Sequence, residues 1–319
     1  MTTAPTVDDS PTPEQLDALY RALSNWGRWG ADDELGALNF LTPDCRAAAG
    51  ALVRSGITVS LAHDFPVSPS PETPSPAHHH MLASGDARDS NGIPGYEASR
   101  DYIGTEVHGM GITHLDALCH MFVRGEMYNG RPADQVKSTG ATANTVMTAA
   151  DGLVGRGVFL DIPRARGVEY LEGNTAITVA DLEAAESTQG SPVRRGDILI
   201  VGGGRDARKA AQHGRLDPFR DGMAGLHPQC LPWLHDREVA LLAGDGISDM
   251  TPGLGVAEWP FPVHQIGIVG MGLHLVDNVD LARLVPECAA QERWEFLCVI
   301  APLRIPGGTG CPVNPIAIF

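Results

Sequence analysis

Short apolar segments, most of them bounded by glycine, proline or charged residues, recur along the chain and limit the folds open to it. Segments of this length that are rich in β-branched and apolar residues are typical of strands. They occur at residues 56–65, 154–161, 196–201, 239–243 and 294–300. Helical patterns are fewer and begin near Thr12, Thr42 and Thr178. The sequence therefore predicts an α/β fold with β-rich mixed sheets and few helices.

No change in composition marks a linker, so we expect a single domain over residues 13–319. The polar residues 1–12 are expected to form a disordered or loosely attached arm. Residues 105–114 are expected to be extended, and the Pro- and Ser-rich residues 66–76 to form a loop.

The formal net charge of −16 restricts the partners of this chain. A field of this sign repels nucleic acid and anionic membrane surfaces, whereas a small neutral substrate is compatible with it. No apolar run reaches the roughly 18 residues that span a bilayer, and residues 1–14 lack the regions of a signal peptide. A cytoplasmic location is therefore expected. The six cysteines include no CxxC pair and are expected to be free thiols.

The most informative segment is HGMGITHLDALCH at residues 108–120. His114 and Asp116 are two residues apart, so their side chains point to the same face of an extended chain. An imidazole and a carboxylate on one face suit a borderline divalent ion such as zinc or manganese. If the chain turns after Asp116, His120 returns to the same site and could act there as general acid or base. The alternative is a chance cluster, since the chain contains 12 histidines.

The same segment resembles the signature of the cyclase superfamily, His-x-Gly-Thr-His-x-Asp-x-x-x-His. Residues 113–116 and His120 match that signature in type and spacing. Residues 25–39, 233–249 and 263–281 are similar to further segments of the longer members, so the resemblance covers most of the chain from residue 25 onward. The superfamily includes kynurenine formamidase, isatin hydrolase and several polyketide-associated cyclases.

This resemblance implies a swivelling β/β/α fold and a homodimer or homotetramer with its site near a subunit interface. It implies that His114 and Asp116 bind a divalent metal, zinc or manganese, and that His120 is the proton shuttle. The family has two further ligands, a histidine and a glutamate about a dozen residues apart. They correspond here to His264 and Asp277.

The chain departs from the signature at the first ligand, because Met110 stands where the family has a histidine. Methionine is a poor ligand for a borderline divalent ion. His108 would lie roughly 20 Å from His114 in a straight strand, and it reaches the site only if the glycines at 109 and 111 make a bulge. Otherwise another histidine fills the place, and the candidates are His80 and His227. A third alternative is a site that binds metal weakly or has lost it.

These features favour a hydrolase that acts on a small cyclic amide, a lactone or an aryl formamide. A metal hydroxide would attack the carbonyl carbon, and His120 would pass a proton to the leaving group. One alternative is a polyketide-type cyclase on the same fold. The other is a metal-free pseudoenzyme that binds a small molecule without turnover.

Further side chains are candidates for the surroundings of the site. Trp26, Trp29 and Asp33 are expected to line the substrate wall. Asp245 and Asp249 could hold the ligand histidines in place, although a plain polar turn explains their spacing equally well.

Overall fold

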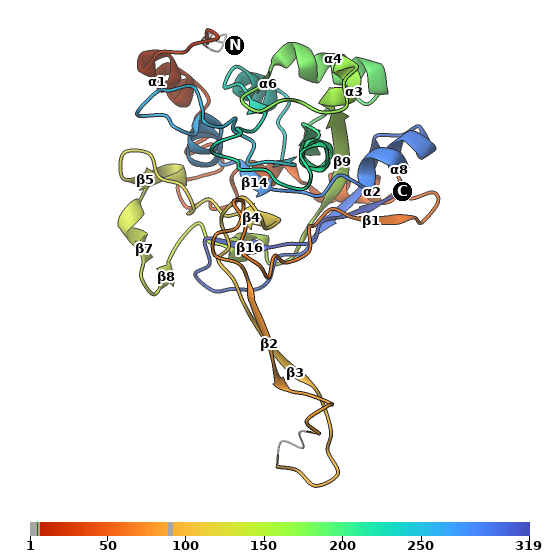
Figure 1. Cartoon of the computed structure of the whole chain (residues 1–319). Coiled ribbons are helices and arrows are strands. Elements are labelled where there is room, and N and C mark those ends of the chain that lie inside the picture. The colour runs from red at the N-terminus through yellow and green to blue at the C-terminus, as the bar shows by residue number, and fades with distance from the viewer. Residues whose placement is uncertain (1–4, 6, 89–91) are drawn as a thin grey trace.

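The computed structural model describes residue 5, residues 7–88 and residues 92–319 (Figure 1). The arm expected at residues 1–12 falls partly outside the described residues, which omit 1–4 and 6. In its described part, Val7 is buried and the Asp8 carboxylate accepts a hydrogen bond of 2.9 Å from the Gln15 side chain. Among the described helices, none combines the length and apolar character needed to cross a membrane.

A nine-stranded mixed sheet forms the centre of the molecule. Its strands are β1 (Thr58–Ser60), β4 (His114–Asp116), β9 (Leu153–Asp161), β11 (Ile198–Gly202), β13 (Leu241–Gly244), β14 (His274–Asp277), β15 (Glu295–Ile300), β16 (Gly310–Pro312) and β17 (Ile316–Ile318). They follow the order β1-β17-β15-β9-β11-β13-β14-β4-β16. The four strands from β9 to β14 are mutually parallel, whereas both flanks are antiparallel.

The position of a strand in the sheet determines how deeply it is buried. Strands β11, β13 and β14 are buried along their whole length, as parallel strands are when both faces of the sheet are covered. The strands predicted at 154–161, 196–201, 239–243 and 294–300 are confirmed as β9, β11, β13 and β15, with small shifts at their ends. The strand predicted at 56–65 is shorter, because β1 pairs only with the three residues of β17.

Eight α-helices are described, and few of them are long. They are α1 (Pro13–Ala22), α2 (Pro43–Gly50), α3 (Ile162–Arg166), α4 (Val179–Gln189), α5 (Arg205–Ala211), α6 (Cys230–Asp236), α7 (Pro262–His264) and α8 (Leu284–Gln291). The hydroxyls of Thr12, Thr42 and Thr178 accept hydrogen bonds from the backbone three residues further on, which fixes the start of α1, α2 and α4. Helices α2 and α4 pack against β9.

Shorter elements complete the fold. The two-stranded pairs are β2 (His78–Ala83) with β3 (Arg100–Gly104), β5 (Glu126–Met127) with β6 (Arg131–Pro132), β7 (Val136–Lys137) with β8 (Gly140–Ala141), and β10 (Ala176–Ile177) with β12 (Gly225–Leu226). Short 3₁₀-helices occur at Gly36–Phe40, Tyr128–Gly130, Ala133–Gln135 and Val146–Ala149, and a π-helix at Gln265–Met271. The β2–β3 hairpin projects away from the body of the molecule (Figure 1).

Candidate metal centre

Strand β4 positions the first two predicted ligands. It lies between β14 and β16, and its residues His114 and Asp116 are 2% and 0% exposed. Their side chains share one face, as the two-residue spacing predicts, and His114 Nε2 lies 3.4 Å from Asp116 Oδ1. A turn follows β4, in which the His120 N–H donates to the Ala117 carbonyl. It returns His120 to the site, with Nε2 4.0 Å from Asp116 Oδ1.

The C-terminal third of the chain supplies the next two predicted ligands. Asp277 ends β14 and stands opposite His114 in the antiparallel register with β4. His264 ends helix α7, and its Nε2 lies 3.2 Å from Asp277 Oδ2 and 3.6 Å from Asp116 Oδ2. The structure thus brings these residues to one place although about 150 residues of chain separate His114 from His264.

His108 also reaches this cluster, whereas Met110 does not offer a ligand of the expected type. The His108 Nδ1 lies 2.8 Å from Asp116 Oδ1, and its Nε2 lies 3.0 Å from Thr309 Oγ1. Its ring stacks on that of His120, with ring centroids 3.6 Å apart. Among the alternatives for the missing ligand, His108 is therefore the histidine that the structure places within reach.

Two glycines make this approach of His108 possible. Gly109 has a φ of +144°, a conformation that strongly favours glycine. A Cβ atom on Gly111 would meet Thr73 Oγ1 at 1.8 Å, so a larger residue does not fit there. The prediction of an extended segment over 105–114 is accordingly wrong: the chain bends at these glycines, and regular strand structure begins only at His114.

A cavity of about 240 Å³ lies over the cluster and gives a substrate access to it. The histidines and carboxylates named above line its polar side. Its apolar wall is formed by Met110, Met121, Ile247 and Phe261. The site is therefore a small pocket that combines one apolar wall with convergent titratable groups, as is typical of small-molecule sites.

Two of the histidines are oriented by a hydrogen bond from Nδ1. The His114 Nδ1 is 2.8 Å from the Ile112 carbonyl, and the His264 Nδ1 is 2.7 Å from Asp249 Oδ2. Carbonyl and carboxylate oxygens only accept hydrogen bonds, so each Nδ1 carries the proton and donates it. Both Nε2 atoms then face the space beside Asp116, which is the arrangement that metal-binding histidines adopt.

The two carboxylates of the cluster also have oxygens that lack a protein partner. Asp116 Oδ2 and Asp277 Oδ1 are buried and accept no hydrogen bond from the described residues. A buried carboxylate oxygen without a donor is costly unless a cation is beside it. Donor atoms of His114, Asp116 and Asp277 lie within 4.8 Å of one another, and so do those of His108, Asp116 and His120. Imidazole and carboxylate donors in this number fit a divalent ion such as zinc or manganese.

The electrostatics of the cluster indicate a place for positive charge. Burial alone would lower the pKa of His114, but the carboxylates of Asp116 and Asp277 outweigh it and raise that pKa to about 9. The pKa of His264 is raised for the same reason, whereas burial raises that of Asp277. Burial lowers the pKa of His120 to about 4, with a further contribution from the neighbouring imidazoles. His120 is therefore neutral at pH 7, while His114 and His264 attract either a proton or an ion.

Asp249 holds His264 in place. Its carboxylate accepts hydrogen bonds from the backbone N–H of Val263 at 2.8 Å and of His264 at 2.9 Å, in addition to the ring Nδ1. Asp245 has a different role, since it accepts from the backbone N–H groups of Gly203 and Arg205. Of the two aspartates considered from the sequence, Asp249 orients a candidate ligand and Asp245 fixes a turn.

We expect Asp249→Asn to weaken ion binding about 10–100-fold, the usual effect of losing an outer hydrogen-bonding partner of a ligand histidine. Asparagine has one acceptor oxygen for three N–H donors, and its amide group would face one of them. Competition with a chromogenic chelator measures the affinity. Asp236→Asn, at a side chain that is 77% exposed, is the matched control. Equal affinities of the two variants would contradict the role assigned to Asp249.

The residues predicted to form the substrate wall lie elsewhere. The Trp26 Nε1–H donates to the Val269 carbonyl at 2.7 Å, and the Trp29 ring packs against Phe40 with centroids 5.1 Å apart. The Asp33 carboxylate accepts a hydrogen bond from the Tyr128 hydroxyl at 3.0 Å. None of these three described side chains lines the cavity over the cluster.

The two substitute ligands proposed from the sequence are also distant from the cluster. His80 lies in the β2–β3 hairpin, where its exposed ring packs beside Tyr102 with centroids 5.1 Å apart. His227 is buried, and its Nδ1 accepts a hydrogen bond from the Gln229 N–H. Neither described side chain lines the cavity.

Three residues of the site gave no signal in the sequence. Thr309, which contacts His108, precedes β16 in a Pro- and Gly-rich segment. Ile247 and Phe261 belong to segments without a chemical motif. Thr309 reaches the site through a long-range backbone hydrogen bond, from the Ala117 N–H to its carbonyl, which a local pattern does not report.

Comparisons with known proteins agree with this geometry. Residues 56–248 match the family model described as "Putative cyclase". A solved structure described as a novel cyclase shares 32% identity, covers 93% of this chain and 100% of its own, and has a TM-score of 0.83. None of the curated proteins compared matches the chain.

Two isatin hydrolases share the fold at lower identity. Isatin hydrolase A from Labrenzia aggregata, bound to benzyl benzoate, is 20% identical, with 84% of this chain and 94% of that chain covered and a TM-score of 0.57. Isatin hydrolase A from Ralstonia solanacearum is 22% identical, with 86% and 97% covered and a TM-score of 0.55. The family predicted from residues 108–120 is confirmed by the family match and by the similar cyclase structure: the chain belongs to the cyclase family.

Proposed function

We propose that the chain is a metal-dependent hydrolase of a small cyclic amide, a lactone or an aryl formamide. The observation that carries the proposal is the pair of buried carboxylates, each with one unpartnered oxygen, Asp116 Oδ2 and Asp277 Oδ1. The Nε2 atoms of His114 and His264 lie beside these two carboxylates. The isatin hydrolases of similar fold support hydrolysis of a ring amide in particular.

The residues that would hold the ion are His114, Asp116, His264 and Asp277, with His108 in place of the ligand missing at Met110. When bound there, a divalent ion would supply Lewis acidity, the chemistry that polarises a carbonyl group and favours attack by water. The protein fixes this donor set in advance, because Ile112 and Asp249 orient the two imidazoles and strand pairing aligns the carboxylates.

His120 is suited to move the proton. Its side chain is 23% exposed and lines the cavity, whereas Asp116 behind it is fully buried. Burial lowers the pKa of His120, so the ring is neutral at pH 7 and has a free nitrogen that faces the cavity and could accept a proton from the attacking water. It then donates that proton to the leaving nitrogen or oxygen. Stacking on His108 holds the ring in this position.

The cavity determines the size and polarity of the substrate. Its volume of about 240 Å³ admits a small molecule, and the side chains of Met121, Ile247 and Phe261 offer an apolar surface to a ring. A flat bicyclic or aryl group can rest on this wall while its carbonyl group faces the histidines. These features favour an aromatic amide or ester over a charged substrate.

The proposal is tested by metal analysis together with a substrate panel. We expect the purified protein to contain zinc or manganese and to hydrolyse a lactam such as isatin, an aryl lactone or an aryl formamide. Removal of the ion by chelation should abolish turnover, and return of the ion should restore it. If the protein retains metal and closes a ring in an aromatic polyketide but hydrolyses none of these substrates, it is a cyclase and the proposal is wrong. If the protein has neither metal nor turnover, the result would favour a protein that binds a small molecule without catalysis.

A further inference from the structure

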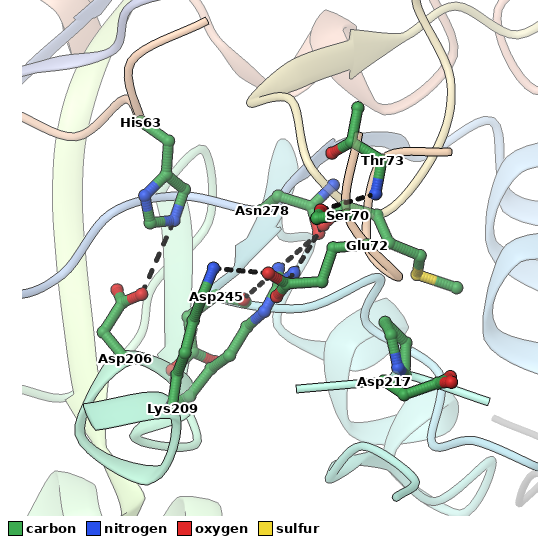
Figure 2. A network of polar contacts seen from close by, with 12 residues as sticks. His63, Ser70, Glu72, Thr73, Asp206, Lys209, Asp217, Asp245 and Asn278 are labelled. Atoms are coloured by element: carbon green, nitrogen blue, oxygen red, sulfur yellow. Dashed lines mark hydrogen bonds and ion pairs between the residues drawn. The ribbon is translucent and has the colours of Figure 1, made fainter. Parts of the chain in front are cut away.

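A second group of metal-type donors lies outside the metal centre. His63 follows β1, Asp206 lies in the first turn of α5, and Asp280 follows β14. The His63 Nε2 is 3.8 Å from Asp206 Oδ1, and its Nδ1 is 4.0 Å from Asp280 Oδ2. Figure 2 shows His63 and Asp206 pointing toward one another. Three separate segments thus place the imidazole of His63 between two carboxylates, one beside each ring nitrogen.

The spacing of these donors is that of ligands and not of a hydrogen-bonded pair. A charge-assisted hydrogen bond between imidazole and carboxylate would have a length of about 2.7–2.9 Å, so contacts of 3.8 and 4.0 Å are not hydrogen bonds. One donor atom from each of the three residues lies within 4.8 Å of the other two. Donors that each stand about 2.0–2.3 Å from a shared ion are separated by about 3–4.5 Å. The contacts of 3.4, 3.6 and 4.0 Å around Asp116 have the same spacing.

Each donor is held by other bonds. The His63 backbone N–H donates to Thr113 Oγ1 at 3.1 Å, and Asp280 Oδ1 accepts from the Ala282 N–H at 2.9 Å. Asp206 Oδ2 is buried and has no hydrogen-bond partner among the described residues. Asp280 Oδ2 and both oxygens of Asp206 therefore remain available beside His63.

The charge balance at this place is negative. Neither Asp206 nor Asp280 forms an ion pair with lysine or arginine in the described part of the chain. The neighbouring cations, Arg205 and Lys209, are both bound to the buried carboxylate of Glu72. Figure 2 shows the contact of Lys209 with Glu72. Burial is the main cause that raises the pKa of Asp206; His63 and Arg205 act against it, and the carboxylates of Asp245 and Asp280 add to it. A cation at the three donors would relieve this repulsion.

The surrounding space is large enough for a hydrated ion. His63, Asp206 and Asp280 line a cavity of about 370 Å³, which can hold the waters that complete the coordination of a divalent ion. This cavity is distinct from the one at the metal centre, and the two share only Met110 among their lining residues.

We infer that His63, Asp206 and Asp280 form a second binding site for a divalent cation. One imidazole and two carboxylates suit manganese or zinc. The ion joins the segment after β1, helix α5 and the segment after β14, so it stabilises the folded state. This site does not depend on the proposed hydrolase activity, because none of its donors belongs to the metal centre.

The test uses the Asp116→Asn protein, in which the metal centre lacks its shared carboxylate. Manganese alone is titrated and the free ion is measured by electron paramagnetic resonance, with thermal unfolding recorded in parallel. We expect one manganese ion to bind per chain and to raise the melting temperature. A second substitution in this protein, Asp206→Asn, should abolish both the binding of manganese and the rise in melting temperature. Addition of Asp64→Asn should leave both unchanged, because Asp64 lines the same cavity and carries the same charge but is not one of the donors.

Two results would overturn the inference: absence of manganese binding in the Asp116→Asn protein, or equal binding by the Asp206→Asn and Asp64→Asn double variants. If Asp116→Asn does not fold, the same comparison is made in the unmodified background with His63→Asn. The bound manganese should then decrease by one ion per chain relative to Asp64→Asn. An unchanged number of ions would contradict the site. Failure of the hydrolase assay affects neither outcome.

Discussion

Asp116→Asn is expected to reduce turnover to the rate of the uncatalysed reaction and to remove the ion from the metal centre. Asp116 belongs to both donor groups of the cluster and lies within 4.0 Å of four histidine rings. Loss of an outer partner of a metal ligand costs about 10–100-fold in affinity, and loss of a shared ligand should cost more. Asparagine keeps the shape of the side chain but removes the charge that both groups need.

This result is measured as zinc and manganese content by mass spectrometry, together with hydrolysis of the best substrate of the panel. Asp277→Asn provides a graded comparison, because Asp277 belongs to only one of the two groups, and its effect should be smaller. Circular dichroism establishes that both variants are folded. An Asp116→Asn protein that keeps its ion at the cluster and its activity would show that the carboxylate is only structural.

The second large effect is expected from His120→Ala, with kcat lower by about 10²–10⁴-fold, the usual contribution of a general acid or base. Ion content should be retained, because His114, Asp116, His264 and Asp277 remain. Added imidazole should restore part of the activity, since it can enter the cavity where the ring was. A purely structural role would not produce this rescue.

His213→Ala is the matched control for that measurement, because His213 is exposed at the end of α5. It should leave kcat and ion content unchanged. If His120→Ala retains nearly all of its turnover, His120 is not the proton shuttle. If it loses the ion as well as the activity, His120 acts as a ligand together with His108 and Asp116, and the assignment of its role is wrong.

The parts of the fold that local patterns encode could be predicted from the sequence. The buried strands β9, β11, β13 and β15 are apolar runs of strand length, and α1, α2 and α4 begin at threonine caps. The convergence of His114 and Asp116 follows from strand geometry alone. The order of the strands in the sheet has no local signal, because it depends on pairing between segments far apart in the chain.

The rest of the site depended on contacts that sequence spacing does not report. His108 reaches the cluster only because the chain bends at Gly109 and because Thr73 packs closely against Gly111. The roles of Asp249 and Asp245 could be told apart only in the structure, where the Asp249 carboxylate accepts three hydrogen bonds from Val263 and His264. The substrate-wall role of Trp26 and Trp29 stays a prediction, because the structure shows only that they do not line this cavity.

The position of β16 and β17 in the sheet has a consequence for synthesis of the protein. Strand β16 pairs with β4, and β17 lies between β1 and β15. A nascent chain that has emerged from the ribosome only as far as residue 309 therefore leaves β1 without its partner in the sheet, and it leaves one edge of β15 and the outer edge of β4 bare. Such open edges favour association between chains. We therefore expect assembly of this protein to be completed after residues 310–318 have emerged, and chaperone binding before that point to protect these edges.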